Sequence, residues 1–243
     1  MKNTKRLDVR VHELCPHLSR SWIQEYIEQG CVSVDGKVIV KTSYAVHDEQ
    51  DIQITIPEQK YVSRSGYKLE QALQEFNLDV TGLVAMDAGL STGGFTDCLL
   101  QRGIAKVYGI DVGTAQVHEK IKQDTRVVVH EQTDIREIIG LVPMVDLVTL
   151  DLSFISVLKV IDVVAQVMQK NAKLLVLIKP QFEVGKKYVG RSGVVKNEKV
   201  KDQTVQAVVE GICAYGFMHQ KTIQARLHGA DGNKELLALF VKQ

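Results

Sequence analysis

The fold of this chain is decided by the stretch Met86-Asp87-Ala88-Gly89-Leu90-Ser91-Thr92-Gly93-Gly94-Phe95-Thr96. A short apolar run, 83–86, leads into this stretch, and the residues after it, 97–100, are typical of a helix. A strand, a glycine-rich turn with a carboxylate and a helix together form a nucleotide-type binding loop. Glycine lets the backbone approach a ligand closely, and the start of a helix presents free N–H groups. The stretch therefore predicts a cofactor site, although a plain strand–helix turn without a ligand remains the alternative.

The spacing of the glycines and acids indicates which cofactor to expect. A second acid, Asp111, ends the next apolar strand, about where the ribose-binding acid of a dinucleotide fold lies, roughly 20 residues on. The dinucleotide pattern GxGxxG is absent, however, and Asp87 would repel a pyrophosphate. A carboxylate there suits a cation that carries an amino group and a sulfonium. The sequence thus favours S-adenosylmethionine and disfavours an NAD-dependent enzyme.

Composition limits the classes of protein that fit. The 243 residues permit one large or two smaller domains, and a hydrophobic content of 45% is enough for a core. Because the formal net charge is only +1, any nucleic-acid binding must rest on local patches. The 4 cysteines form no CxxC pair and have no zinc-ligand spacing, so we expect free thiols and no metal. Without an apolar signal segment or a run of about 18 apolar residues, a cytoplasmic protein with no membrane span is expected.

Residues 1–60 are predicted to form a small α+β domain. Two short helices are expected over 6–15 and 22–29, and an Asp-Gly pair at 35–36 lies between β-branched runs. That pair is a strong hairpin signal, because the turn needs positive φ at both of its central residues. A further strand is expected over 51–56, where apolar and polar residues alternate.

Residues 61–243 show a different pattern, in which apolar strand-like runs alternate with helical stretches. The runs are 83–86, 107–110, 127–129, 145–150 and 174–178. This alternation predicts an α/β domain with a mainly parallel sheet and helices on both faces. Ligands of such sheets bind at the carboxyl ends of the strands. The residues expected at those ends are Asp87, Asp111, Asp134, Asp151 and Lys179.

Four charged residues are candidates for chemistry. Lys179 directly follows five apolar residues, and burying an ammonium is costly unless it has a partner, which Asp151 at a neighbouring strand end could be. An ion pair that only closes the top of the sheet would explain both residues equally well. Lys68 at the start of a helix and Glu235 before the last strand are, taken alone, typical of a solvated surface.

The first sixty residues resemble the S4 RNA-binding domain. The matching stretches are Arg6-Leu7-Asp8, Ser19-Arg20 and Gly30-Cys31-Val32-Ser33-Val34-Asp35-Gly36-Lys37. The resemblance implies that basic residues of the helix pair contact the RNA backbone, and the candidates are Lys5, Arg6, Arg10 and Arg20. A docking domain with a solvated charged face is the alternative.

The rest of the chain resembles a family of RNA-modifying enzymes. Lys68, Asp151, Lys179 and Glu235 match the order Lys-Asp-Lys-Glu of the FtsJ-like ribose 2′-O-methyltransferases. Two segments are more specific for this family than the four residues alone, namely Asp151-Leu152-Ser153-Phe154-Ile155-Ser156 and Lys179-Pro180-Gln181-Phe182-Glu183. With the N-terminal module, the whole chain resembles the TlyA family, which are ribosomal RNA cytidine 2′-O-methyltransferases also called hemolysins. The chain departs from the family at Ser65, where the family often has glycine. It also departs over residues 227–233, which lack the proline-rich sequence of many members, and this second departure weakens the assignment of Glu235.

The resemblance implies a Rossmann-like methyltransferase fold and a role for each site residue. Lys179 would take the proton of the ribose hydroxyl, Asp151 would orient it, and Lys68 and Glu235 would align the ribose, with the order of the two lysines left open. Asp87 and the glycine loop would hold the methionine end, Asp111 the ribose and Asp134 the adenine amino group, while Phe95 fits core packing equally well. The expected cofactor-binding residues are Asp87, Gly89, Ser91, Gly93, Gly94, Phe95, Asp111, Val112, Asp134 and Ile135.

A base-rich loop over 185–201 follows Lys179 and could contact RNA through Lys186, Lys187 and Arg191. The expected partner is ribosomal RNA or a ribosomal subunit, and the oligomeric state stays open. Two other readings remain. One is a ribosome-assembly factor that binds RNA through an inert methyltransferase fold. The other is a membrane-lytic hemolysin, which the lack of a span or a strongly amphipathic basic helix disfavours.

Overall fold

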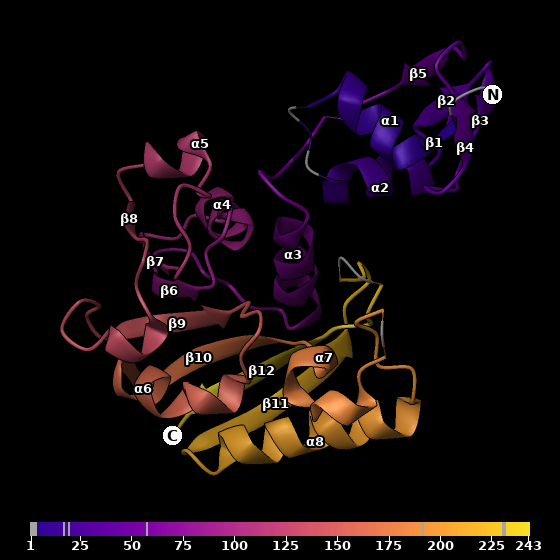
Figure 1. Cartoon of the computed structure of the whole chain (residues 1–243). Helices are drawn as coiled ribbons and strands as arrows, with labels where there is room; N and C mark the ends of the chain where they lie inside the picture. Colours follow the sequence, from indigo (N-terminus) through magenta and orange to yellow (C-terminus); the bar gives the residue numbers. More distant parts are fainter. Residues whose placement is uncertain (1–3, 17, 19, 57, 191, 230–231) are drawn as a thin grey trace. The chain divides into compact units, whose positions relative to one another are not determined.

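A computed structural model describes residues 4–16, 18, 20–56, 58–190, 192–229 and 232–243 of the chain. The chain divides into two compact units, Met1–Lys60 and Tyr61–Gln243. Their helices and strands are labelled in Figure 1.

The first unit is a small α+β unit. The two helices bury one apolar face each, through Leu7 and Val11 on one and Ile23 and Ile27 on the other. The predicted hairpin is present, because Asp35 and Gly36 both have positive φ, at 50° and 75°, between two antiparallel strands. The elements of this unit are β1 (Thr4–Arg6), α1 (Leu7–Leu14), α2 (Arg20–Glu28), β2 (Val32–Val34), β3 (Lys37–Val38), β4 (Ala45–His47) and β5 (Ile52–Ile54).

The second unit alternates strands and helices, as its sequence predicts. Its helices are α3 (Ser65–Glu75), α4 (Gly94–Gln101), α5 (Glu119–Lys122), η1 (Ile135–Glu137), η2 (Val157–Lys159), α6 (Ile161–Gln166), α7 (Pro180–Glu183), η3 (Lys186–Tyr188) and α8 (Glu198–Cys213). Its strands are β6 (Val84–Ala88), β7 (Lys106–Ile110), β8 (Val127–His130), β9 (Val145–Leu150), β10 (Met168–Ile178), β11 (Phe217–Gln224) and β12 (Leu236–Lys242).

These strands form one seven-stranded sheet in the order β11-β12-β10-β9-β6-β7-β8. The strands from β10 to β8 run parallel, and β12 is antiparallel to both of its neighbours. The predicted α/β fold with a mainly parallel sheet is therefore confirmed. The sequence does not predict β11. Its residues 217–224 are largely polar and half exposed at the edge of the sheet, so the usual strand pattern is weak there.

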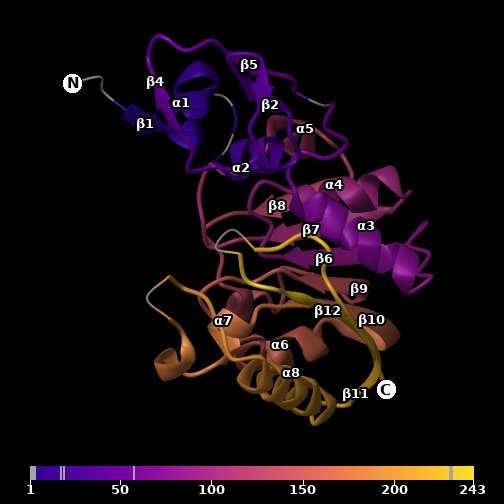
Figure 2. The ribbon, with the colours of Figure 1, turned by 90° about the vertical axis from the view of Figure 1, so that its right-hand side faces the viewer.

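Helices cover both faces of the sheet, with α3, α4 and α5 on one side and α6 and α8 on the other (Figure 2). Alternate residues of each strand feed the two apolar cores, because side chains of a strand point to opposite faces in turn. In β9, Leu147 packs in the core under α3 and α4, whereas Val148 and Leu150 pack in the core under α6 and α8. This two-sided burial explains the nearly continuous apolar runs of the central strands.

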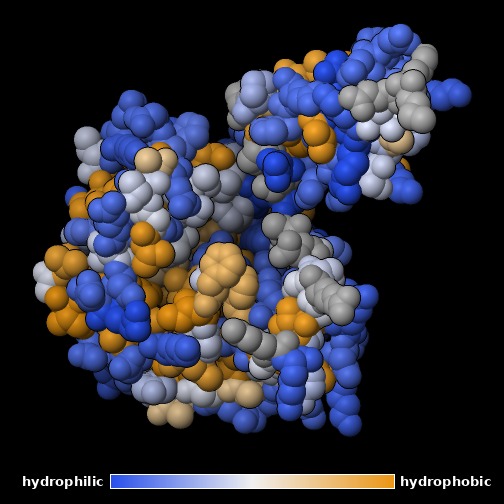
Figure 3. All heavy atoms as spheres, in the orientation of Figure 1, coloured by the Kyte–Doolittle hydropathy of each residue, from blue (hydrophilic) through white to orange (hydrophobic). Residues whose placement is uncertain are grey.

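The order of the strands fixes where a ligand can bind. The chain moves outward from β6 to β8 and then returns to β9 on the other side of β6, so the strand order reverses between β6 and β9. A crevice opens outside the carboxyl ends of the strands at such a point. Within the described residues, no helix is both long enough and apolar enough to cross a membrane. The face drawn in Figure 3 has apolar side chains gathered near the middle of the second unit, amid a largely hydrophilic surface.

Candidate active site

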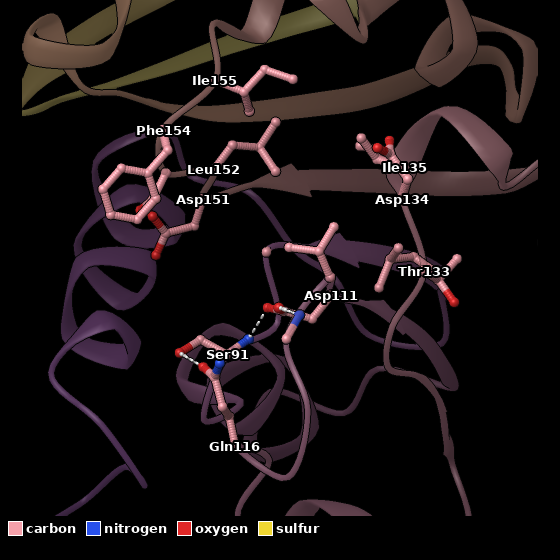
Figure 4. A pocket seen from close by; sticks show the side chains of 15 residues that line it. Ser91, Asp111, Gln116, Thr133, Asp134, Ile135, Asp151, Leu152, Phe154 and Ile155 are labelled. Atoms are coloured by element: carbon pink, nitrogen blue, oxygen red, sulfur yellow. Dashed lines mark hydrogen bonds between the residues drawn. The ribbon is translucent and has the colours of Figure 1, made fainter.

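A pocket of about 530 Å³ lies where β6, β7 and β9 end. This volume is in the range of small-molecule and cofactor sites. In Figure 4, Asp151 and Phe154 lie on one side of the pocket and Thr133, Asp134 and Ile135 on the opposite side. Its lining residues are Gly89, Ser91, Ile110, Asp111, Val112, Gly113, Gln116, Thr133, Asp134, Ile135, Asp151, Leu152, Ser153, Phe154 and Ile155. Among the described residues, no three His, Cys, Asp or Glu side chains are grouped closely enough to hold a metal ion.

Asp111 joins the two loops that form the floor of the pocket. Its Oδ2 accepts a hydrogen bond of 2.7 Å from the backbone N–H of Ser91, and its Oδ1 accepts one of 2.7 Å from the N–H of Gly113 (Figure 4). Ser91 in turn donates from its hydroxyl to Gln116 at 3.4 Å. Each carboxylate oxygen of Asp111 keeps a further lone pair, so this side chain can still accept hydrogen bonds from a ligand.

Gly89 allows two loops to approach closely at the pocket wall. Its φ is +85°, and a Cβ at this position would overlap the backbone carbonyl oxygen of Asp151. The sequence predicts a glycine needed for close backbone approach. The structure shows that the neighbouring backbone is the loop after β9 and that the space next to it forms the pocket. The positive φ and the overlap with the Asp151 carbonyl oxygen both disfavour any residue other than glycine at position 89.

Asp134 lies at the far side of the pocket and begins η1. Its carboxylate accepts hydrogen bonds of 2.9 Å from both the backbone N–H and the Nε of Arg136. These hydrogen bonds lower the pKa of Asp134 to about 2. Asp134 is therefore ionised at neutral pH, and the side chain expected to meet an adenine amino group is held by a neighbouring guanidinium.

Asp87 and three other predicted cofactor residues are not among the residues that line the pocket. Asp87 is 1% exposed, and its carboxylate accepts hydrogen bonds of 2.7 Å from the hydroxyls of Thr96 and Thr149. Phe95 packs in the core under α4, and Gly93 and Gly94 begin that helix. The side chain of Asp87 is buried because it precedes the end of β6, in the layer covered by α4. These four residues support the loop, and the pocket surface itself comes from its neighbours.

Burial raises the pKa of Asp87 to about 6 from an ordinary 3.8, so the folded protein holds this proton more tightly than the unfolded chain. Such an acid adds stability below its unfolded pKa and loses that contribution, on the order of 3 kcal/mol, as the pH rises through its folded pKa. We expect the melting temperature of the wild type minus that of Asp87→Asn to fall as the pH rises from 3.8 to about 6 and to stay constant above it. Thermal denaturation across this range tests the prediction, and a difference independent of pH would contradict it.

The four charged residues singled out from the sequence form two ion pairs. The Nζ of Lys179 lies 2.7 Å from Asp151, with side-chain exposures of 12% and 17%, and it also donates to the hydroxyl of Ser153 at 2.9 Å. The Nζ of Lys68 donates to Glu235 at 2.5 Å, and these side chains are only 9% and 3% exposed. Burying charges to this extent demands a partner of opposite sign, which each has.

Three of these four residues lie at the ends of neighbouring strands, and Lys68 lies on α3. Ile178 of β10 pairs with Leu236 of β12, so Lys179 and Glu235 are the next residues along that ladder. Val176 of β10 pairs with Leu150 of β9, which puts Asp151 at the end of the adjacent strand. The sheet register thus gathers Asp151, Lys179 and Glu235 at the ends of three consecutive strands, one of which borders the pocket.

Several pocket residues were not assigned from the sequence. Phe154 is 90% exposed at a φ of +67°, and its ring contacts that of Phe182 with centroids 5.1 Å apart. A bulky residue with positive φ is rare. The segment Asp151–Ser156, which carries part of the family resemblance, contains Phe154 and is the available sequence signal for it. The other lining residues without a sequence-based assignment are Ile110, Gly113, Gln116, Thr133, Leu152, Ser153 and Ile155.

Most predicted RNA-binding residues of the first unit are paired with acids. Lys5 and Arg10 both reach Glu13, at 2.8 and 3.0 Å, and Arg6 reaches Asp8 at 2.7 Å. Arg20 is exposed at the first residue of α2. These pairs reduce the positive charge that the helix pair offers to a polyanion.

In the base-rich loop, the ammonium of Lys187 lies 4.9 Å from the ring centre of Tyr188. Lys186 belongs to η3, and Arg191 falls outside the described residues.

Comparison with known proteins agrees with this fold. The model of the FtsJ-like methyltransferase family matches residues 61–242, and that of the S4 domain matches residues 5–52. Hemolysin A of Brachyspira hyodysenteriae is 35% identical over 97% of this chain and 99% of its own length. The 16S/23S rRNA (cytidine-2′-O)-methyltransferase TlyA of Mycobacterium tuberculosis (strain H37Rv) is 40% identical over 89% of this chain and 82% of its own.

Solved structures give the same picture. A crystal structure from Lactococcus lactis, described as that of a candidate hemolysin, is 39% identical and has a TM-score of 0.74, covering 76% of this chain and 90% of that one. Structures of S-adenosylmethionine-dependent methyltransferases, such as one from Mesorhizobium loti at 16% identity and a TM-score of 0.55, share the fold over 73% of this chain and 99% of that one.

Proposed function

The chain belongs to the TlyA family of FtsJ-like methyltransferases, and on this premise we propose that it transfers a methyl group from S-adenosylmethionine to the 2′-hydroxyl of a cytidine in ribosomal RNA. The observation that carries the proposal is the two ion pairs, the partly buried Lys179–Asp151 and the buried Lys68–Glu235, together with the pocket of cofactor size that Asp151 lines.

The lining of the pocket fits the proposed cofactor. Asp111 would accept from the ribose hydroxyls, and Val112, Asp134 and Ile135 would form the adenine side. Gly89 and Ser91 would border the methionine end, where the missing Cβ of Gly89 lets the loop after β9 come close enough to form the adjacent pocket wall. When bound, the cofactor supplies a methyl group on a sulfonium, which becomes neutral as the methyl leaves. We propose that the four residues outside the lining (Asp87, Gly93, Gly94 and Phe95) act by holding the shape of the loop.

Lys179 is the proposed base, and because only an uncharged amine can accept a proton, its ammonium must first release one to solvent. A ribose hydroxyl is a weak acid and must lose its proton as its oxygen attacks, so the protein has to supply a nearby proton acceptor. The partners of Lys179, Asp151 and Ser153, both line the pocket, which brings its amine to the pocket rim. Lys68 instead faces Glu235, which is 3% exposed, and is enclosed. We therefore propose that Lys179 accepts the proton and that Asp151 orients Lys179. The second ion pair, Lys68 with Glu235, would align the ribose.

Binding of RNA is proposed for the first unit and for the base-rich loop. The match to the S4 domain model over residues 5–52 supports the first assignment. Arg20 offers an exposed charge directly. RNA phosphates would displace Glu13 and Asp8 from Lys5, Arg6 and Arg10, and exchange of one anion for another costs little at an exposed surface. Lys186, Lys187 and Arg191 would contact the backbone near the proposed site.

Methyl transfer to ribosomal RNA tests the proposal directly. The protein is incubated with tritiated S-adenosylmethionine and with naked ribosomal RNA or either ribosomal subunit, and the RNA is digested to nucleosides. We expect the label in 2′-O-methylcytidine. Label in a base-methylated nucleoside would refute the assigned target atom. RNA binding without any transfer, on every substrate tested, would instead favour an assembly factor. In calorimetry S-adenosylmethionine should bind and NAD should not.

A further inference from the structure

Gln71 is a buried polar side chain that connects the helix of Lys68 to the segment beside Glu235. It is 7% exposed on α3. Its Nε2 donates to the backbone carbonyl of Gln224 at 3.0 Å, and its Oε1 accepts from the backbone N–H of Arg226 at 2.8 Å. A single amide group therefore satisfies one acceptor and one donor of a backbone that has just left β11.

The backbone that Gln71 holds is bonded directly to Glu235. Between Gln224 and Arg226 lies Ala225, whose N–H donates to the carbonyl of Glu235 at 2.9 Å. Gln224 also pairs with Leu236 in the ladder between β11 and β12. The position of this short segment thus determines the position of the Glu235 backbone.

Lys68 and Gln71 lie on one side of α3. They are three residues apart, and residues at this spacing are neighbours on a helix surface. Two buried side chains thus join α3 to the Glu235 region, Lys68 through its ion pair and Gln71 through its amide. Leu69, Ala72 and Leu73 pack in the core with α4. That apolar contact is non-directional and leaves the helix some freedom to slide and turn.

We propose that Gln71 is a positioning residue for methyl transfer, which sets the location of α3 so that the Lys68 ammonium meets the Glu235 carboxylate in the reactive geometry. The inference rests on the proposed function. An amide suits this task because it donates and accepts at once and adds no charge beside the ion pair. Leucine at position 71 would leave the carbonyl of Gln224 and the N–H of Arg226 without this partner, and glutamate could not donate to Gln224.

Among the described residues, two further polar contacts between α3 and this region involve exposed side chains. Arg226 reaches Glu75 at 2.7 Å with 70% of its own side chain exposed, and Lys221 donates to the carbonyl of Glu75 at 3.0 Å. Exposed ion pairs contribute little to holding a helix in place. Glu75→Gln is therefore a matched control on the same helix and the same partner segment, and Gln74→Leu is a matched control for the amide, because Gln74 is exposed.

The test measures the single-turnover rate of methyl transfer to ribosomal RNA with enzyme in excess. We expect Gln71→Leu and Gln71→Glu to lower this rate about tenfold through misplacement of Lys68, while the dissociation constant of S-adenosylmethionine stays within about twofold of the wild type. Gln74→Leu and Glu75→Gln should keep the wild-type rate. In a Glu235→Gln background, Gln71→Leu should cost less than about twofold more, because the contact that it positions is already gone.

A purely structural role gives a different result. It would lower the rate by the same factor in the wild-type and Glu235→Gln backgrounds, or would weaken cofactor binding together with the rate, and either outcome overturns the inference. Wild-type rates in Gln71→Glu and Gln71→Leu would overturn it as well. Should Glu235→Gln and Lys68→Met themselves transfer at the wild-type rate, the proposed site fails and the inference fails with it, whereas slow Glu235→Gln beside fast Gln71→Leu rejects Gln71 alone. Melting curves and cofactor calorimetry show that each variant is folded.

Discussion

Lys179→Ala is expected to abolish methyl transfer, with a loss of about 10³-fold, and to leave binding of S-adenosylmethionine intact. The amine of Lys179 is the proposed proton acceptor, and its direct contacts are with Asp151 and Ser153 at 2.7 and 2.9 Å. Removing the amine leaves the ribose hydroxyl without a base, while Asp111 and the glycine loop keep their contacts. Transfer of tritium to ribosomal RNA and calorimetric titration of the cofactor measure the two properties separately.

Lys179→Arg separates proton transfer from charge. A guanidinium keeps the positive charge opposite Asp151 but does not lose its proton in a protein. We therefore expect Lys179→Arg to be nearly as inactive as Lys179→Ala. If the arginine variant retained most of the activity, the ion pair would serve only to close the end of the sheet. Lys170→Ala, at the exposed opposite end of β10, is the matched control and should be unaffected.

Gly89→Ala is expected to lower the affinity for S-adenosylmethionine by about 100-fold or more. Two independent costs fall on this position. A φ of +85° disfavours any L-residue by about 1–2 kcal/mol, and the added methyl would overlap the carbonyl oxygen of Asp151. The second cost is the larger one, because the neighbour is backbone and cannot rotate away. Relief requires the loop after β9 to move, which displaces both a wall of the pocket and the carboxylate that orients Lys179.

Gly82→Ala is a sharp control for this variant. Gly82 also has a positive φ, +73°, but no atom lies within 4 Å of its added Cβ. It therefore pays the conformational cost alone and should lose stability by about 1 kcal/mol with unchanged affinity for the cofactor. Calorimetry with S-adenosylmethionine and thermal denaturation compare the two variants. Equal affinities in Gly89→Ala and the wild type would show that the pocket at the end of β6 does not bind the cofactor.

Much of the site could be predicted because the chemistry is carried by strand ends. In a parallel sheet, residues that directly follow apolar runs meet at one edge, so the sequence alone predicts Asp111, Asp151 and Lys179 together. Side-chain direction could not be predicted in this way. Asp87 occupies the same kind of position, yet its carboxylate turns into the protein toward two threonine hydroxyls, whereas Asp134 lines the pocket with its carboxylate paired to Arg136.

The sequence by itself determined most of the strands and helices and the glycine loop, because burial patterns and turn residues are local properties, and its resemblance to a known family pointed to the four charged residues. Tertiary structure decided the partners. Lys68 and Glu235 are separated by 167 positions, and only the antiparallel return of β12 beside β10 brings them within 2.5 Å. The same return places Gln224 and Arg226 against Gln71. Such contacts depend on the register between distant strands, which is set by packing over the whole sheet and is not written in any short stretch of the chain.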